Sequence, residues 1–333
     1  KCSCHTAVDM GALGRLVMLM MPIIPRFVVG WVAKRYVAGP DLESALQVMR
    51  SMKSQGACFT LDVLGEEITS LEEANFFVNE YHRALDAIIA EGMDANISIK
   101  PTAFGLLIDE NKALENIEKI TRIASNSNIF VRLDMEDHRV TQSTIDIVIE
   151  MHNRGLTNIG TVLQSRLFRT GGDISSLSSK LGGDSDVRIC KGIYLESEDI
   201  AHTKYHDIVI ATNNAIDDLL DAGAYTAIAS HDIPVIDHSI AALEDRGMGP
   251  KTDDPRGNAG PVRSGKGLGY EFQFLLGVRG NIRRKLAKKG HRTRIYIPYG
   301  SRWYEYSMRR LRENPDIAWH VAKSIIMPWT NRR

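Results

Sequence analysis

A repeat of strand-like and helix-like segments is the sequence feature that most constrains the fold. After residue 57 a short apolar run ends in a polar residue, a longer amphipathic stretch follows, and this pair recurs eight times. Because the apolar runs are almost continuous, they predict strands that are buried on both faces of a parallel sheet. The predicted strands cover 58–62, 97–100, 129–134, 159–164, 187–191, 225–230, 268–273 and 294–297. The predicted helices cover 71–91, 110–125, 142–153, 173–181, 199–222, 234–246, a stretch that ends near 289, and 301–313.

Eight such units over about 275 residues match the size of a (β/α)₈ barrel, so the predicted fold class is α/β. An open, doubly wound sheet is the alternative, and the first strand–helix turn is not Gly-rich as that fold requires. Residues 1–56 are predicted to form an N-terminal helical arm, and residues 57–333 the barrel. Within the arm, a helix over 41–55 would place Leu42, Leu46 and Met49 on one apolar face.

The composition is that of a soluble globular protein. The chain carries 41 basic and 41 acidic side chains, and this zero formal net charge argues against a nucleic-acid partner. Its four cysteines indicate a reducing compartment, so a cytoplasmic protein is expected. Cys2, Cys4 and His5 are not followed by a second ligand pair at matching spacing, and no metal site is predicted.

Residues 16–25 form the most apolar run of the chain. The run is too short to span a bilayer, and Pro22 and Pro25 interrupt it. A packing helix, an oligomer contact and an element at the membrane surface all fit this pattern.

Polar side chains stand at the predicted strand ends, where a (β/α)₈ barrel carries its active site. They are Asp62, Lys100, Asp134, Gln164, Arg188, Lys191, Ser230, His231, Glu271 and Tyr296. Lys100 and Asp134 leave adjacent strands, so a positive and a negative group are expected side by side. A structural ion pair and a functional pair both remain open at this point.

The last predicted helix carries a second candidate site. Tyr306, Arg309, Arg310 and Glu313 recur at helical spacing and share one face. Two adjacent guanidinium groups beside a tyrosine suit a carboxylate or a phosphate. The alternative is a solvent-exposed face with ordinary salt bridges.

Three further patterns point to other chemistry. Residues 260–267 have P-loop spacing, but Gly267 stands where Ser or Thr must hold magnesium, so a nucleotide site is rejected. His202 and His206 are four residues apart and have no third ligand, which argues against zinc. Lys100 at a strand end could form a Schiff base as in an aldolase, and this alternative stays open.

Eight motifs of the chain resemble, in order, those of bacterial monofunctional proline dehydrogenases. They are LDVLGEE (61–67), ISIKP (97–101), VRLDMED (131–137), VLQSR (162–166), VRICKGIY (187–194), IASHD (228–232), YEFQFLLGV (270–278) and RIYIPYG…YSMRRLREN (294–314). The resemblance implies a distorted barrel whose last helix lies over the barrel mouth. It also implies noncovalent FAD, oxidation of L-proline to Δ1-pyrroline-5-carboxylate by hydride transfer to flavin N5, and electron transfer to a quinone.

The resemblance assigns substrate roles to the last strand and helix. Arg309 and Arg310 would hold the proline carboxylate, Tyr306 would shape that pocket, and Glu313 would support the arginines. Tyr296 would pack on the pyrrolidine ring, and its size favours proline over hydroxyproline.

The resemblance also assigns roles around the flavin. Lys100 and Asp134 would lie on its substrate side. Gln164 and Arg188 would contact the isoalloxazine ring, with Arg188 close to N5. The residues expected along the rest of FAD are Lys191, Gly192, Ser230 and His231.

Residues 247–269 form a longer loop than the family pattern leads us to expect. Homo-oligomerisation and a peripheral contact with the inner face of the membrane stay open; the latter follows from the quinone step alone.

Two rival functions remain, a flavin-free aldolase that uses Lys100 and a barrel that binds an amino acid without turnover.

Overall fold

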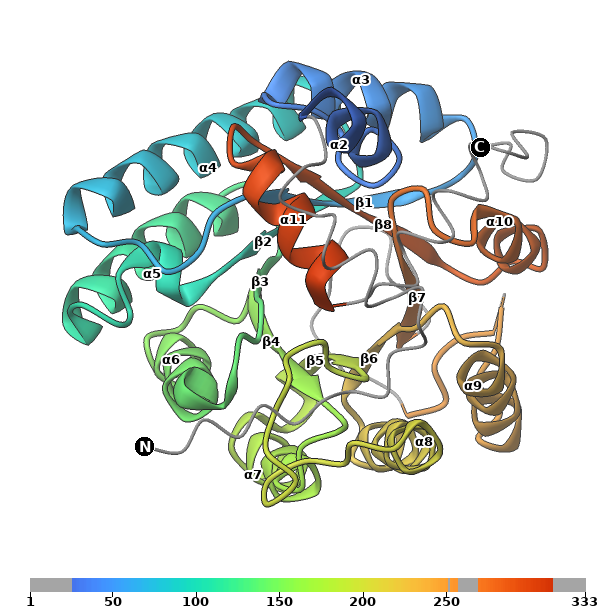
Figure 1. The fold of residues 1–333 in the computed structure, drawn as a ribbon. Helices are drawn as coiled ribbons and strands as arrows, with labels where there is room; N and C mark the ends of the chain where they lie inside the picture. Colours follow the sequence, from blue (N-terminus) through green and yellow to red (C-terminus); the bar gives the residue numbers. More distant parts are fainter. Residues whose placement is uncertain (1–25, 251, 257–268, 314–333) are drawn as a thin grey trace.

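The computed structural model describes residues 26–250, 252–256 and 269–313, except that the side chains of 27, 28, 32 and 309–313 fall outside this description. Eight parallel strands pair in sequence order, and β8 pairs with β1 to close a barrel (Figure 1). The strands are β1 (Cys58–Val63), β2 (Ala95–Ile99), β3 (Val131–Leu133), β4 (Ile159–Gln164), β5 (Asp186–Cys190), β6 (Tyr225–Ala229), β7 (Tyr270–Leu275) and β8 (Thr293–Tyr299). The predicted (β/α)₈ barrel is confirmed.

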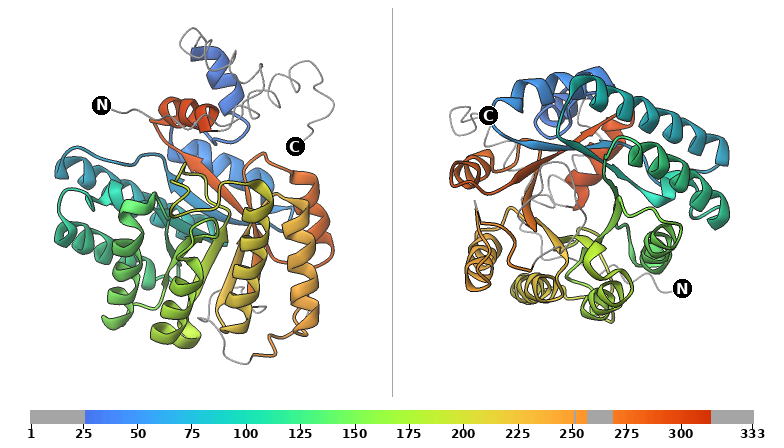
Figure 2. Two further views of the ribbon diagram at one scale, coloured as in Figure 1. Left: turned by 60° about the horizontal axis from the view of Figure 1, so that its bottom comes forward. Right: turned by 180° about the vertical axis from the view of Figure 1, so that it is seen from behind.

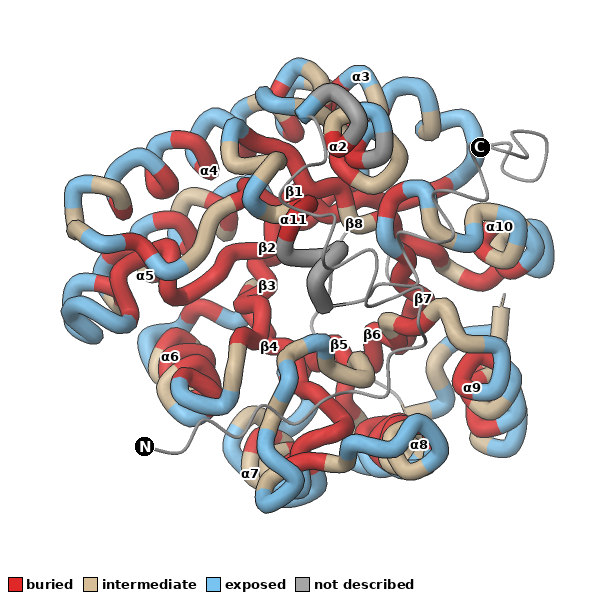
Figure 3. The backbone as a smooth tube through the Cα atoms, in the orientation of Figure 1, coloured by how far each residue is buried: buried red, intermediate tan, exposed pale blue. Residues whose placement is uncertain are grey.

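Helices surround this barrel and shield it from solvent (Figure 1). They are α4 (Leu71–Glu91), α5 (Glu110–Ser125), α6 (Thr141–Asn153), α7 (Thr170–Leu181), α8 (Tyr205–Asp221), α9 (Ile233–Asp245) and α10 (Gly280–Lys288). Figure 3 shows that the strands and the inward sides of these helices are buried, while the outward sides are exposed. This is the burial that amphipathic helices on a two-faced sheet require.

Two of the described helices precede the barrel. Helix α3 (Leu42–Lys53) begins at Asp41, whose carboxylate accepts a hydrogen bond from the Ser44 amide at 2.9 Å. Its predicted apolar face is buried and joins the same hydrophobic core as β1 and β8. Helix α2 (Arg26–Ala33) lies against the last helix, α11 (Trp303–Glu313). The division into an arm, 1–56, and a barrel, 57–333, stays a prediction.

Helix α11 crosses the open end of the barrel, above the C-terminal ends of the strands (Figure 2). It does not continue the outer ring as the other barrel helices do. The predicted position of the last helix over the barrel mouth is therefore confirmed.

Four strands differ from the expected apolar runs, because their inward side chains, at every second residue, are polar. These inward pairs are Arg132 on β3 with Asp134 directly after it, Asp186 and Arg188 on β5, Glu271 and Gln273 on β7, and Arg294 and Tyr296 on β8. All of these side chains except the partly buried Tyr296 are buried. The alternate residues face the helices and supply the apolar content that the sequence pattern detects.

Buried ion pairs fill the lower part of the barrel. The Arg294 Nε donates to Glu271 Oε1 at 2.8 Å, and the Arg132 guanidinium pairs with the Asp186 carboxylate. Arg132 also donates to the Asp186 carbonyl oxygen at 2.8 Å. Each buried charge thus has an opposite charge and further hydrogen bonds, which offsets the cost of removing it from water. Glu271, predicted at a strand end, belongs to this lower layer and not to the mouth.

Several predicted boundaries were wrong, two of them by enough to change the reading of the site. Strand β7 lies two residues further along the chain than predicted, so Gln273 and not Glu271 reaches the mouth. Helix α8 begins at Tyr205 and not near 199, since the preceding loop is held over the mouth side of β4 and β5. The Arg166 guanidinium bonds the Tyr194 carbonyl oxygen of that loop at 2.7 Å.

Pro298 does not end β8 as predicted, but lies within it opposite Asp62. The missing amide N–H removes no ladder bond, because pairing with β7 stops at Tyr296. On that side the Pro298 carbonyl oxygen accepts a hydrogen bond from the Ala38 amide at 2.9 Å.

Several predictions fall outside the described residues. They concern Cys2, Cys4, His5, the apolar run 16–25, the P-loop-like stretch 260–267 and most of the 247–269 loop. Among the helices that are described, none is long and apolar enough to cross a membrane.

Glu271→Ala is expected to lower the free energy of unfolding by about 3–5 kcal/mol, because it removes the nearer carboxylate of the buried Arg294 guanidinium and leaves only Asp94, at 3.6 Å. Urea denaturation measures this change. The control is Glu115→Ala, which removes an exposed carboxylate from its pair with Lys112 and should have little effect. Equal effects of the two substitutions would contradict the assigned role of the buried pair.

Candidate active site

A cavity of about 590 Å³ opens at the barrel mouth, beneath α11. Ten of the thirteen predicted site residues line it, namely Lys100, Asp134, Gln164, Arg188, Lys191, Gly192, Ser230, His231, Tyr296 and Tyr306. They come from six strands, the loops that follow them, and α11, so only the closed barrel brings them together. The size suits a ligand of small-molecule or cofactor dimensions.

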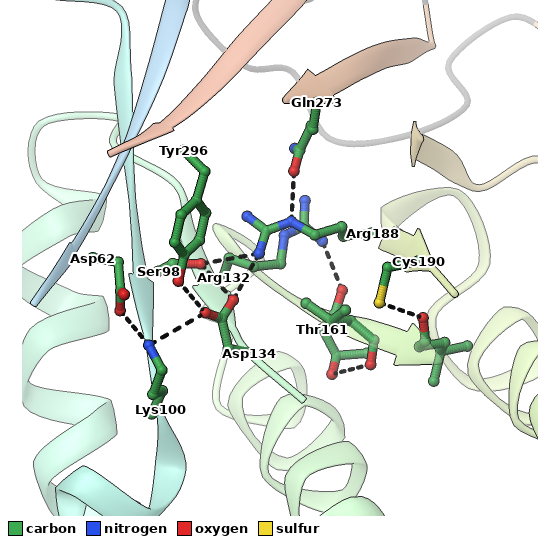
Figure 4. A network of polar contacts seen from close by, with 12 residues as sticks. Asp62, Ser98, Lys100, Arg132, Asp134, Thr161, Arg188, Cys190, Gln273 and Tyr296 are labelled. Carbon is green, nitrogen blue, oxygen red and sulfur yellow. Dashed lines mark hydrogen bonds and ion pairs between the residues drawn. The ribbon is translucent and has the colours of Figure 1, made fainter. Parts of the chain in front are cut away.

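Asp134 is the centre of the polar network in this cavity (Figure 4). Its Oδ1 accepts hydrogen bonds from the Ser98 hydroxyl at 2.6 Å and from the Arg188 guanidinium at 2.7 Å. Its Oδ2 accepts one from the Tyr296 hydroxyl at 2.6 Å. Burial alone would raise the pKa of Asp134, but the nearby charges of Arg188 and Lys100 outweigh it and lower the pKa. Asp134 is therefore ionised.

Lys100 lies between two carboxylates. Its Nζ donates to Asp62 Oδ1 at 2.5 Å and lies 3.8 Å from Asp134 Oδ2 (Figure 4). Burial would lower the pKa of Lys100, but the two carboxylate charges outweigh this effect and raise it. Lys100 is thus an ammonium group that is fixed in place at neutral pH.

Arg188 is held from two sides. Its Nε donates to Gln273 Oε1 at 2.5 Å, while the Gln273 amide donates to Glu271 Oε1 at 2.6 Å. Its guanidinium carbon also lies 5.3 Å from the centre of the Tyr296 ring. These contacts fix the plane of the guanidinium, so its remaining N–H groups have a set direction toward the cavity.

Gln164, at the end of β4, and Gly192, in the loop after β5, lie close together in the cavity wall. The Gln164 amide nitrogen donates to the Glu136 carbonyl oxygen at 2.7 Å, which leaves Oε1 buried and without a hydrogen-bond partner among the described residues. Gly192 has a positive φ of 93°, and a Cβ there would lie 2.8 Å from Gln164 Oε1. The absence of a side chain at residue 192 therefore keeps this acceptor in place.

Lys191 and His231 line the outer part of the cavity. The Lys191 ammonium pairs with Asp232, and Asp232 also accepts a hydrogen bond from the Tyr205 hydroxyl at 2.7 Å. His231 Nε2 accepts a hydrogen bond from the Leu275 amide at 2.9 Å. Burial lowers the pKa of His231 to about 4, so its ring is neutral at physiological pH and presents Nδ1–H as a donor.

Arg309, Arg310 and Glu313 lie in α11, and their side chains fall outside the described part of the structure. Tyr306, earlier on the same helix, does line the cavity. The tyrosine places this part of α11 over the mouth. The clamp assigned to the two arginines stays a prediction.

Sequence reasoning placed Asp62 at a strand end but gave it no further role, and in the structure it holds Lys100. It missed four other residues that hold the site together, namely Ser98, Tyr205, Asp232 and Gln273. Ser98 and Gln273 lie two positions from Lys100 and Glu271, on the same inward face. The two-residue period of a strand was the signal that could have identified them. Tyr205 and Asp232 carried no such signal, since they meet where α8 begins and directly before α9.

No group of three or more His, Cys, Asp and Glu side chains forms a metal-binding arrangement in the part of the chain that is described. His202 packs edge-on against the Phe168 ring, with ring centres 4.8 Å apart.

The sequence is similar to those of known proline dehydrogenases. The sequence model of proline dehydrogenase matches residues 45–323. Proline dehydrogenase 1 of Bacillus subtilis (strain 168) is 32% identical over 302 residues, which span 88% of this chain and 90% of that protein. Proline dehydrogenase 2 of the same strain is 34% identical over 284 residues, or 85% and 87% of the two chains. For the Deinococcus radiodurans proline dehydrogenase, the identity is 32% over 302 residues, or 88% and 90%.

The chain belongs to the proline dehydrogenase family. This membership confirms the family that the sequence motifs predicted, and the protein is accordingly an enzyme of the oxidoreductase class. A crystal structure of proline utilization A (PutA) from Bdellovibrio bacteriovorus superimposes with a TM-score of 0.73 at 21% identity. This match covers 84% of the enzyme and 32% of that longer protein, and it shows a shared fold.

We expect Lys100 to resist Schiff-base formation at neutral pH, because its paired ammonium has no free lone pair. Treatment with glyoxylate and borohydride, followed by peptide mass spectrometry, should find no adduct on Lys100. Asp62→Asn removes one of the two carboxylates that raise the pKa of Lys100, so more of the amine becomes neutral and trapping should increase. Efficient trapping in the unmodified enzyme would contradict this assignment.

Proposed function

We propose that the enzyme oxidises L-proline to Δ1-pyrroline-5-carboxylate, with FAD as its noncovalent cofactor and a quinone as the final electron acceptor. The observation that carries the proposal is the fixed set of charges from Asp62, Lys100, Asp134 and Arg188 beneath α11, in a chain of this family. Two cations and two carboxylates balance one another there. The two arginines of α11 would add a net positive charge that a substrate carboxylate neutralises.

The residues around the cavity fit FAD. Gln164 Oε1 is a buried acceptor without a partner among the described residues, and a flavin ring N–H would satisfy it. Gly192 leaves room where a Cβ would meet Gln164. Lys191 supplies a cation and Ser230 and His231 supply donors for the pyrophosphate and the rest of the cofactor. When bound, FAD supplies the acceptor for the hydride that leaves the substrate.

The side chains on the substrate side orient the amino acid and set its protonation. Arg309 and Arg310 would hold the carboxylate in a bidentate contact, so that the ring is fixed for reaction. The proline amine must lose its proton before a hydride can leave, and the arginine pair and Lys100 lower its pKa. Tyr306 would complete the wall of the pocket, and Glu313 would orient the arginines.

Arg188 would lie beside flavin N5, where a cation stabilises the reduced and more anionic ring. Its contacts with Asp134 and Gln273 hold it there without reorganisation. Tyr296 would pack on the substrate ring, and its hydroxyl is fixed by Asp134. The fixed Tyr296 side chain would restrict the space next to the pyrrolidine ring of the substrate, so proline is favoured over hydroxyproline.

The rival functions differ in their requirements at Lys100 and at the cavity. An aldolase needs a neutral amine, whereas Lys100 is paired with carboxylates. A barrel that only binds an amino acid through its carboxylate leaves the buried Gln164 acceptor without a partner. Transfer of electrons to a quinone is compatible with a peripheral contact at the inner face of the membrane.

The purified enzyme is expected to be yellow and to bleach when L-proline is added without air, because a bound flavin loses its visible absorbance on reduction. Absorbance spectra under anaerobic conditions measure this, and addition of a soluble quinone should restore the colour. A colourless protein that binds proline and stays inert when FAD is supplied would overturn the proposal in favour of the binding barrel.

Arg309→Met and Arg310→Met are each expected to raise KM for proline by about tenfold or more, since each removes a charge-assisted contact with the carboxylate. Steady-state kinetics measure KM, and the flavin absorbance should stay unchanged. Arg312→Met is the matched control, because it removes the same charge from the same helix outside the shared face. Loss of flavin with an unchanged KM would refute the proposed clamp.

A further inference from the structure

A second cavity lies at the opposite end of the barrel from the mouth. It measures about 570 Å³ and opens where β1 and β8 begin, beside the C-terminal half of α10. Cys58, the first residue of β1, lines it, whereas the residues of the mouth follow the other ends of the strands. Nothing in proline oxidation requires this cavity.

Three cationic side chains line the cavity, and the described residues of its lining include no carboxylate. The cations are Arg284, Lys288 and Arg292. The charge of Arg292 is already matched, because it pairs with Asp94 and lies 3.6 Å from Glu271. Arg284 and Lys288 form no ion pair with any described residue. The cavity therefore holds two positive charges that this part of the chain does not neutralise.

His291 adds a hydrogen-bond donor to the wall. Its side chain lines the cavity although the residue is only 8% exposed, and its Nδ1 lies 2.9 Å from the Tyr270 hydroxyl. With the hydroxyl donating to Nδ1, the ring proton stands on Nε2, which has no hydrogen-bond partner among the described residues. An N–H donor in the wall of an open cavity is available to a ligand that enters it.

The segment that contains α10 and the start of β8 is rich in basic residues, which adds positive charge around the cavity. Residues 276–294 contain eight Lys and Arg side chains and neither Asp nor Glu. Lys285 on α10 and Lys289 directly after it are exposed, and they line a neighbouring hollow together with Arg284 and Lys288. Clustered charges of one sign raise the local concentration of an oppositely charged ligand.

We propose that the cavity formed by Arg284, Lys288 and His291 at the base of the barrel binds a phosphate group. A guanidinium, an ammonium and an imidazole N–H suit a ligand with several oxygens and more than one negative charge, which a phosphate provides. The volume accommodates a small phosphorylated compound. The phosphate comes either from such a soluble compound or from a lipid headgroup, which presents the same chemistry.

Calorimetric titration of the whole enzyme with pyrophosphate, at a fixed ionic strength, tests the soluble source. Sedimentation with phosphatidylcholine vesicles, with and without phosphatidic acid, tests the lipid source. The test variant is Arg284→Gln/Lys288→Gln. The matched control is Lys285→Gln/Lys289→Gln, which removes the same charge from the same helix but leaves the cavity wall intact.

Binding of pyrophosphate or of the phosphatidic acid vesicles should weaken by about tenfold or more in the test variant, and much less in the control. His291→Phe should also weaken it, with a thermal unfolding midpoint showing that the variant is folded. If the enzyme binds pyrophosphate, the ligand of the cavity is a soluble phosphate compound. If it binds only the phosphatidic acid vesicles, the ligand is a lipid headgroup. The proposal is overturned if neither probe binds, or if both double variants lose affinity equally. Proline turnover, measured separately, reports on the proposed function and not on this site.

Discussion

The structure depends on the pairing of charges inside the barrel. Arginine side chains on β3, β5 and β8 point into an interior that excludes water, and each requires an opposite charge there. The contacts are continuous, since Arg294 bonds Glu271, Glu271 bonds Gln273, Gln273 bonds Arg188, and Arg188 bonds Asp134. The interactions that hold the base of the barrel thus also fix the position of the side chains at its mouth.

This arrangement explains why a rigid site can be built from isolated strand ends. Asp134 is held by donors from β2, β5 and β8, so no single loop determines its position. Such a site needs little reorganisation when a ligand enters, and electrostatic stabilisation is most effective when the groups are fixed in advance. Helix α11 has the complementary role, because it covers the mouth and carries the residues proposed to bind the substrate carboxylate.

The zero formal net charge conceals a strong separation of charge within the enzyme. At the mouth, Lys100 and Arg188 are matched by Asp62 and Asp134. Along α10 the basic side chains have no acidic neighbour in sequence, and two of them line the cavity at the base. Charge that is not compensated within the protein is available to a ligand, which is why the two ends of the barrel suit different partners.

The sequence by itself determined the eight strand–helix units, the order of the strands and the identity of most mouth residues, since each follows from local periodicity and from motifs. It did not reveal that Gln273 holds Arg188 or that Tyr205 meets Asp232. Pro298 shows the same limit, because a local rule ends the strand there, whereas β8 continues through it: pairing with β7 has already stopped at Tyr296, so the proline removes no ladder hydrogen bond. Only the closure of the barrel decides such contacts, because they join residues far apart in the chain whose proximity depends on the register of strands that close on one another.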